Sequence, residues 1–87
     1  MIINIIAGDI TSANIVGHRM RIARAMKNPA MNQQELLAKL QTEGINISQS
    51  TLSKIENGDR YVKDIELKAI AKVLNISILW FMNESDN

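Results

Sequence analysis

Apolar and polar residues follow one another along this chain with the spacing of amphipathic helices. Residues 14–26 carry apolar side chains three and four positions apart, which places them together on one side of an α-helix. They form two stripes, Val16 with Met20 and Ala23, and Ile15 with Ile22 and Met26. Each of the two apolar stripes needs other apolar residues packed against it. We expect later helices to cover the first stripe and the isoleucines near the N-terminus to cover the second.

Four more segments repeat the helical spacing. Their apolar positions are Leu36, Leu37 and Leu40 in residues 33–41, Leu52 and Ile55 in residues 49–57, Leu67, Ile70, Ala71 and Leu74 in residues 65–74, and Ile78, Leu79, Trp80 and Phe81 in residues 78–82. A side chain that can accept hydrogen bonds from a first helical turn precedes each segment, namely Asn32, Ser48, Asp64 and Ser77. Helix ends are expected at Pro29, Gly44, Gly58 and Asn75. The pattern predicts an all-α domain of five helices.

The two ends of the chain differ from this middle part. Residues 1–6 are apolar apart from Asn4, and such a segment is expected to be covered by other residues. We treat residues 1–14 as an apolar N-terminal arm, which either packs on its own domain or is exchanged with a partner subunit, and we favour the first arrangement. Residues 84–87 form a polar tail, so the domain itself spans residues 15–83.

The short helix expected after Ser48 carries the most information. Leu52 and Ile55 give it one apolar face, and Gly58 is suited to the left-handed conformation that ends a helix. The other face is polar and almost free of negative charge, with Gln49, Ser50, Ser53, Lys54 and Asn57. Gln and Lys side chains can hydrogen-bond base edges and phosphates in a DNA major groove, and they also suit a face that meets only solvent.

Residues 52–58, Leu-Ser-Lys-Ile-Glu-Asn-Gly, resemble the end of the recognition helix in the phage-repressor-like helix-turn-helix family, known as the XRE or Cro/C1 type. Residues 31–40, Met-Asn-Gln-Gln-Glu-Leu-Leu-Ala-Lys-Leu, resemble the first helix of that motif. Residues 61–81 continue the resemblance, which covers about four-fifths of the chain from about Val16 onward. It implies a lambda-repressor-like DNA-binding domain of five helices, to which this chain adds its apolar arm.

The chain departs from that family between the two motif helices. Residues 41–47 make a connection longer by about five residues than is usual, and Leu37 stands where the family usually has alanine. A larger side chain and a longer turn can compensate each other if Ile45 and Ile47 fold back under the two helices. The recognition helix would then be set at a different angle.

The resemblance also implies which residues contact DNA. Matching residue by residue gives as base contacts Gln33, Gln49, Ser50 and Lys54. It gives as phosphate contacts Asn32, Asn57, Arg60, Tyr61 and Lys63. Two alternatives stay open. Gln49 and Ser50 also suit a helix start without any DNA contact, and the amide of Asn57 can instead satisfy backbone groups at a helix end.

Arg24 and Glu56 are expected to have a structural role. Glu56 follows Ile55 close to the apolar face, where an unpaired carboxylate would be costly to remove from water. The resemblance matches Glu56 with Arg24 as an ion pair between two helices. Such a pair holds the fold together and takes no part in chemistry.

Composition narrows the class of function. The 87 residues contain no cysteine and one histidine, His18, so a disulfide, a cysteine-based zinc site and a thiol nucleophile are excluded. The sequence has no metal-ligand spacing, no Gly-rich phosphate loop and no evident catalytic pair of carboxylates. We therefore expect no metal, no cofactor and no enzymatic activity.

The net charge and the hydropathy of the chain constrain its function only weakly. The net charge is +1, but residues 16–63 hold eight Lys and Arg against four Asp and Glu, a local charge of +4. This suits a DNA-binding surface, and it also suits many solvated surfaces.

The apolar N-terminal run lacks the basic start of a signal peptide and is too short to span a bilayer, so we expect a cytoplasmic protein without membrane contact.

These features predict a sequence-specific DNA-binding regulator. We expect a homodimer on an inverted repeat with half-sites about one helical turn apart. The last helix is apolar nearly all round, which makes Trp80 and Met82 candidates for the dimer interface. Repression is favoured because a small protein that only occupies DNA blocks polymerase more easily than it recruits it. The alternative is a protein-interaction module, such as an antitoxin, whose arm or last helix binds a second protein.

Overall fold

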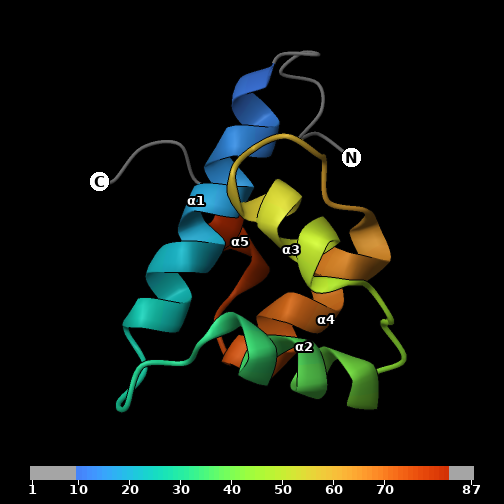
Figure 1. The fold of residues 1–87 in the computed structure, drawn as a ribbon. Coiled ribbons are helices and arrows are strands. Elements are labelled where there is room, and N and C mark those ends of the chain that lie inside the picture. The colour runs from blue at the N-terminus through green and yellow to red at the C-terminus, as the bar shows by residue number, and fades with distance from the viewer. Residues whose placement is uncertain (1–9, 83–87) are drawn as a thin grey trace.

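The structure is a computed structural model that describes residues 10–82, and this part of the chain forms five helices and no strand. The helices are α1 (Ile10–Ala25), α2 (Gln33–Thr42), α3 (Gln49–Glu56), α4 (Asp64–Leu74) and α5 (Ile78–Met82) (Figure 1). The all-α fold expected from the apolar spacing is thereby confirmed. No helix among these residues is long and apolar enough to cross a membrane.

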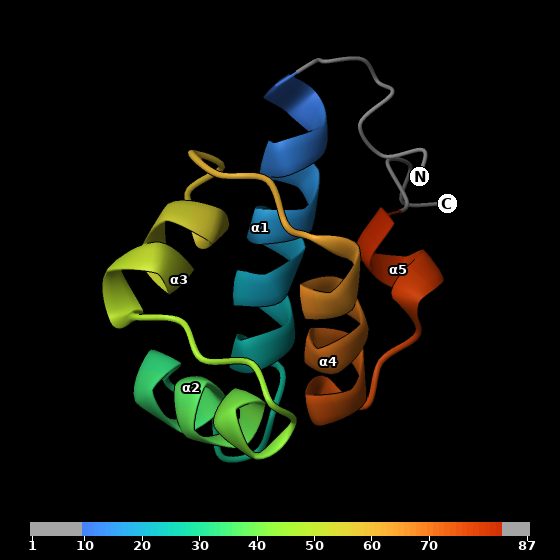
Figure 2. The same cartoon turned by 90° about the vertical axis from the view of Figure 1, so that its right-hand side faces the viewer.

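The helices pack around α1. This helix contacts α3, α4 and α5, while α2 packs against α3 and α4. Figure 2 shows α3 and α5 on opposite sides of the bundle, with α1 and α4 between them. The core is built from the apolar stripes, and its largest fully buried side chains are Met20, Leu36, Leu40, Leu52, Ile55, Ile70, Leu74 and Phe81.

Helix ends follow the capping residues of the sequence. Asn32 and Glu35 form a capping box, in which Asn32 Oδ1 accepts from the Glu35 N–H at 2.8 Å and Glu35 Oε1 accepts from the Asn32 N–H at 2.9 Å. Ser48 Oγ accepts from the Thr51 N–H at 3.0 Å at the start of α3. Caps of this kind stabilise a protein by about 1 kcal/mol each. Asn75 ends α4 in the left-handed conformation, with φ at 58°.

Two predicted helix starts were wrong. α1 begins at Ile10, not near Asn14, because no glycine or proline between Gly8 and Gly17 interrupts the helix. Residues 10–14 are therefore helical and continuous with the rest of α1. At α4 the N-cap is Lys63 and not Asp64. Asp64 lies in the first turn, where a negative charge is favoured by the helix dipole.

The long connection between α2 and α3 folds back on the core. Gly44 takes a φ of 84°, and the Ile45 N–H then donates to the Leu40 carbonyl at 3.0 Å. This places Ile45 in the core, while Ile47 and Leu37 pack against it from the side. Ile45 and Ile47 thus fold back toward the two helices as predicted, whereas the compensation between Leu37 and the longer turn stays a prediction.

The second apolar stripe of α1 is only partly covered by the described residues. Ile15 and Ile22 are half-buried, and Met26 is 58% exposed. The N-terminal isoleucines that we expect to cover this stripe lie outside the described residues.

Candidate nucleic-acid interface

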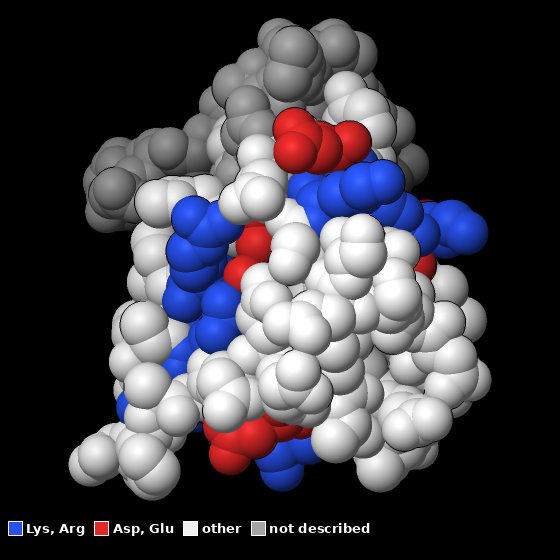
Figure 3. All heavy atoms as spheres, in the orientation of Figure 1, with Lys and Arg blue, Asp and Glu red and all other residues white. Residues whose placement is uncertain are grey.

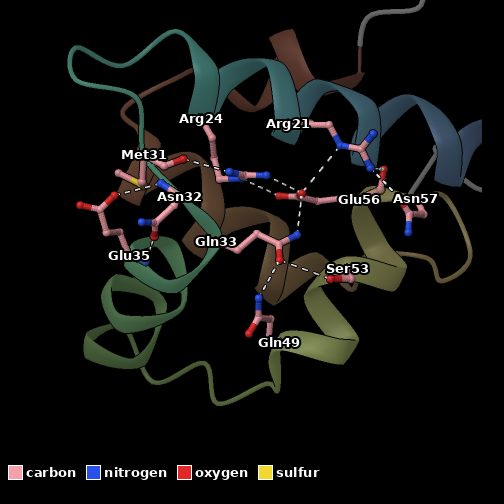
Figure 4. Close-up of polar contacts among 10 residues, drawn as sticks. All are labelled: Arg21, Arg24, Met31, Asn32, Gln33, Glu35, Gln49, Ser53, Glu56 and Asn57. Carbon is pink, nitrogen blue, oxygen red and sulfur yellow. Dashed lines mark hydrogen bonds and ion pairs between the residues drawn. The ribbon is translucent and has the colours of Figure 1, made fainter.

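The two faces of α3 have different surroundings. Leu52 and Ile55 are fully buried against the core. Gln49, Ser50 and Lys54 are exposed on the opposite face. Gln33, at the start of α2, lies beside Gln49, at the start of α3, so one predicted base-contacting residue of each helix adjoins the other (Figure 4).

Gln33 and Gln49 are hydrogen-bonded to each other across the starts of α2 and α3 (Figure 4). Gln49 Nε2 donates to Gln33 Oε1 at 3.2 Å, and Ser53 Oγ donates to the same oxygen at 3.3 Å. Gln34 Nε2 donates to Gln49 Oε1 at 3.0 Å. Both the nitrogen and the oxygen of the exposed Gln49 amide are therefore hydrogen-bonded to residues of α2. In the half-buried Gln33, both lone pairs of the side-chain oxygen accept a hydrogen bond.

Glu56 lies beneath these amides and is 3% exposed. Arg24 donates to it twice at 2.7 Å, from Nε to Oε2 and from Nη2 to Oε1. Gln33 Nε2 donates to Oε1 at 3.0 Å. Arg24 Nη1 also donates to the Met31 carbonyl at 2.9 Å. The ion pair joins α1 to α3 and holds the loop before α2, and removal of one partner of such a buried pair costs about 3–5 kcal/mol.

Arg21 lies one helical turn before Arg24 and contacts the end of α3. Its Nη2 donates to the Asn57 side-chain oxygen and, at 3.3 Å, to the Glu56 carbonyl. Half of the Arg21 side chain is exposed. Asn57 thus uses its oxygen to bind α1, which is a structural role, while the residue as a whole remains exposed.

Arg60 forms a second bidentate ion pair in the loop after α3. Its Nη1 and Nη2 donate to the two carboxylate oxygens of Glu66 at 2.9 and 3.0 Å, and the Lys63 N–H donates to Oε1 at 2.9 Å. Burial raises the pKa of Glu66, but these donors outweigh burial and hold the pKa below its ordinary value. The hydrogen bond to Glu66 raises the pKa of Arg60. Arg60 is therefore engaged within the protein, and Tyr61 and Lys63 lie beside it at the surface.

Charge is unevenly distributed on this side of the molecule. Figure 3 shows Lys and Arg side chains gathered over α1 and over the loop that follows α3, with a largely uncharged surface over α3 between them. The phosphates of a DNA duplex flank the major groove in the same way, with uncharged base edges between two charged strands. Asn32 is exposed at the start of α2, where its side-chain oxygen and its N–H are engaged in the capping box with Glu35.

The residues predicted for the dimer interface lie on α5, away from α3. Trp80 is half-buried, with its ring centroid 5.1 Å from that of Phe81 and the Arg19 guanidinium 4.7 Å above it. Met82 packs partly against the core. Leu79, which the sequence did not single out, is 76% exposed and is the most exposed large apolar residue of α5.

The sequence missed two residues of this surface. Gln34 contacts Gln49, and Arg21 contacts both Glu56 and Asn57. A signal for Arg21 exists, since it lies three positions before Arg24 and so on the same side of α1. Gln34 is recognisable only as an exposed neighbour of Gln33. His18 is exposed, and the described residues contain no group of three or more His, Cys, Asp or Glu that could hold a metal ion.

Comparison with known proteins agrees with this geometry. The sequence model of a helix-turn-helix family matches residues 22–81, which include α2, α3 and the long turn between them. No curated protein and no solved structure matches the chain.

Proposed function

Because the chain belongs to the helix-turn-helix family of the Cro/C1 type, whose members bind DNA as regulators, we propose that it is a sequence-specific transcriptional repressor that reads DNA through α3. The observation that carries this proposal is the exposed, doubly held amide of Gln49 at the start of α3. A side chain that is already fixed before binding loses little conformational freedom when it meets a base.

Gln49 is suited to adenine. A glutamine amide has two lone pairs on its oxygen and two N–H groups. The hydrogen bond from Gln34 uses one lone pair of Gln49, and the hydrogen bond to Gln33 uses one of its N–H groups. One acceptor and one donor remain, which is the pair that glutamine offers to adenine N6 and N7 in the major groove. Ser50 and Lys54 lie exposed on the same helix and supply further contacts, while Gln33 supports Gln49 from beneath.

Phosphate contacts come from both sides of α3. Asn32 and the first turn of α2 face one strand, and the exposed Tyr61 and Lys63 face the other. Arg60 contributes less, because Glu66 holds its guanidinium, whereas Asn57 uses only its oxygen to accept from Arg21 and can donate to a phosphate through its nitrogen. These contacts fix the position of the protein on DNA without reading its sequence.

The repressor acts as a homodimer on an inverted repeat. Leu79 and its neighbour Ile78 are exposed on α5, which leaves the two α3 helices of a symmetric pair free for half-sites about one helical turn apart. The same exposed face of α5 is what a second protein would bind if the chain acted as an antitoxin-like module. Purification with a second small protein, and no self-association when alone, would favour that alternative.

The proposal is tested by selecting bound sequences from a pool of randomised duplexes and titrating the selected duplex against a scrambled one at two salt concentrations. A repressor of this kind selects a palindrome and binds it at least about a thousandfold more tightly than the scrambled duplex. Failure to select any sequence, with only weak and salt-sensitive binding, would contradict the proposal.

A further inference from the structure

The side-chain amides of Gln33, Gln34 and Gln49 are linked in a row by hydrogen bonds, and each amide can rotate about its last side-chain bond. A glutamine amide rotated by 180° exchanges its donor and its acceptor with almost no change of shape. The hydrogen bonds of the row run from Gln34 to Gln49 and from Gln49 to Gln33. Taken alone, the row is equally satisfied when all three amides are reversed, so the glutamines by themselves do not decide which atom Gln49 turns toward each neighbour.

The carboxylate of Glu56 decides between the two orientations of these amides. Its carboxylate receives two hydrogen bonds of 2.7 Å from Arg24 and therefore carries a charge and only accepts hydrogen bonds. Gln33 Nε2 lies 3.0 Å from Glu56 Oε1. A reversed Gln33 would place its oxygen at that distance from the carboxylate, and two acceptors without a hydrogen between them repel. Gln33 is thus required to donate to Glu56.

The orientation of the Gln33 amide in turn fixes the orientation of the exposed amides of Gln49 and Gln34. With its nitrogen turned to Glu56, Gln33 turns its oxygen to Gln49 and Ser53, at 3.2 and 3.3 Å (Figure 4). Gln49 then has to donate through Nε2, and its oxygen faces Gln34, which donates in turn. Each bond of the chain strengthens the next, because hydrogen-bonded groups polarise one another.

We propose that the buried carboxylate of Glu56 sets which atoms Gln49 presents to a base, through a directional relay Glu56–Gln33–Gln49–Gln34. This inference rests on the proposed reading of DNA by Gln49 and adds to it a positioning residue that touches no base. A reversed Gln49 would offer its donor where the base pair needs an acceptor, so the ion pair that holds α1 to α3 also maintains the sequence preference.

The relay is tested with Glu56→Met, which keeps the approximate size of the side chain and removes both oxygens that can accept from Gln33. The matched control is Glu66→Met, which makes the same change in the other buried Arg–Glu pair, outside the relay. Affinities are measured by fluorescence anisotropy, at a temperature where circular dichroism shows every variant folded. The probes are four duplexes that differ only at the base pair where Gln49→Ala loses its preference.

We expect Glu56→Met to lower the ratio of affinities between the preferred and the other base pairs about tenfold, within the range of a good bidentate contact. Glu66→Met should lose stability and keep the ratio. A folded Glu56→Met variant with the ratio of the wild type would overturn the relay, even if Gln49→Ala lowers that ratio. If Gln49→Ala itself changes no preference, the proposed reading by Gln49 fails first.

A second variant provides the test if Glu56→Met does not fold. Gln33→Met breaks the relay one step later and leaves both Arg24–Glu56 hydrogen bonds in place. The relay predicts a loss of preference at the base pair read by Gln49, whereas loss of a direct contact from Gln33 would affect another base pair. An unchanged preference at the Gln49 position in folded Gln33→Met would contradict the relay.

Discussion

The backbones of Gly17 and Ile55 are in direct contact. A β carbon added to Gly17 would lie 1.9 Å from the carbonyl oxygen of Ile55, so glycine is what allows α1 to approach α3 this closely. Glycine costs about 0.5–1 kcal/mol within a helix relative to alanine. The close approach offsets that cost, since it brings Arg21 and Arg24, farther along α1, within reach of Glu56 on α3.

Replacement of Gly17 by alanine should separate the two helices. We expect Gly17→Ala to lower the free energy of unfolding by about 2–3 kcal/mol, because a methyl group has no space against rigid backbone. Gly44→Ala is the control, since nothing lies within 4 Å of the added carbon and only the φ of 84° is strained. That strain costs about 1 kcal/mol. Urea unfolding measures both values, and equal losses in the two variants would contradict the close contact.

The stability of the protein should depend on pH through Glu66. Burial raises its pKa, but the hydrogen bonds from Arg60 and from the Lys63 N–H outweigh burial, so the folded-state pKa lies below the ordinary 4.5. As the pH falls, the unfolded state therefore takes up a proton before the folded state does. The stability contributed by this pair is complete above pH 4.5 and is lost as the pH falls through the lower folded-state pKa.

The measurement is the free energy of unfolding of the wild type and of Glu66→Gln from neutral to acid pH. We expect the advantage of the wild type to be largest near neutral pH and to shrink in acid. A difference between the two proteins that stays constant over the whole range would show that Glu66 gains nothing from its partners.

Lys63 is expected to bind phosphate. Lys63→Ala should weaken binding to selected and scrambled duplexes by the same factor and reduce the slope of log affinity against log salt by about 1. Lys68→Ala is the control, because Lys68 is exposed on α4 beside Ile65 and Lys72, away from α3. A change of base preference in Lys63→Ala, or an equal change of slope in Lys68→Ala, would refute this assignment.

The exposed apolar side chain on α5 offers a test of the dimer. Leu79→Lys should dissociate the proposed homodimer in sedimentation equilibrium and leave the fold intact, because Leu79 is 76% exposed in the single chain. Ile65→Lys makes the same kind of change at a residue of α4 that is 65% exposed and should leave the dimer unchanged. Trp80 is less suitable, since its ring packs on Phe81 and a substitution would also disturb the core. A Leu79→Lys variant that remains dimeric would place the interface elsewhere.

Local signals in the sequence predicted much of the fold. Ser48, Asn75 and Ser77 act at the helix ends where their side chains suggested it, because a cap depends on residues only a few positions away. The start of α1 was predicted wrongly because Thr11, Ser12 and Asn14 are of types that favour a cap, yet the helix begins before them, at Ile10. Residue type alone therefore did not locate this helix start.

Contacts between distant parts of the chain were harder to predict. The role of Gly17 depends on the distance between α1 and α3, and no feature of the sequence around Gly17 reveals that distance. Gln34 becomes part of the site only because α2 and α3 bring it to Gln49, fifteen positions away. The pairing of Arg24 with Glu56 was expected from the family resemblance and not from the spacing of residues, and the structure forms it with two hydrogen bonds.

The central claim is that Gln49 reads DNA from the start of α3. The most direct measurement is the affinity of the wild type, Gln49→Ala and Gln41→Ala for the selected duplex and for its variants at each base pair. Gln41 is also an exposed glutamine but lies toward the other end of α2, so its replacement controls for the loss of a polar side chain. We predict that Gln49→Ala loses preference at one base pair per half-site, where the wild type favours adenine, and that Gln41→Ala keeps it. Unchanged affinity and preference in Gln49→Ala would contradict the account.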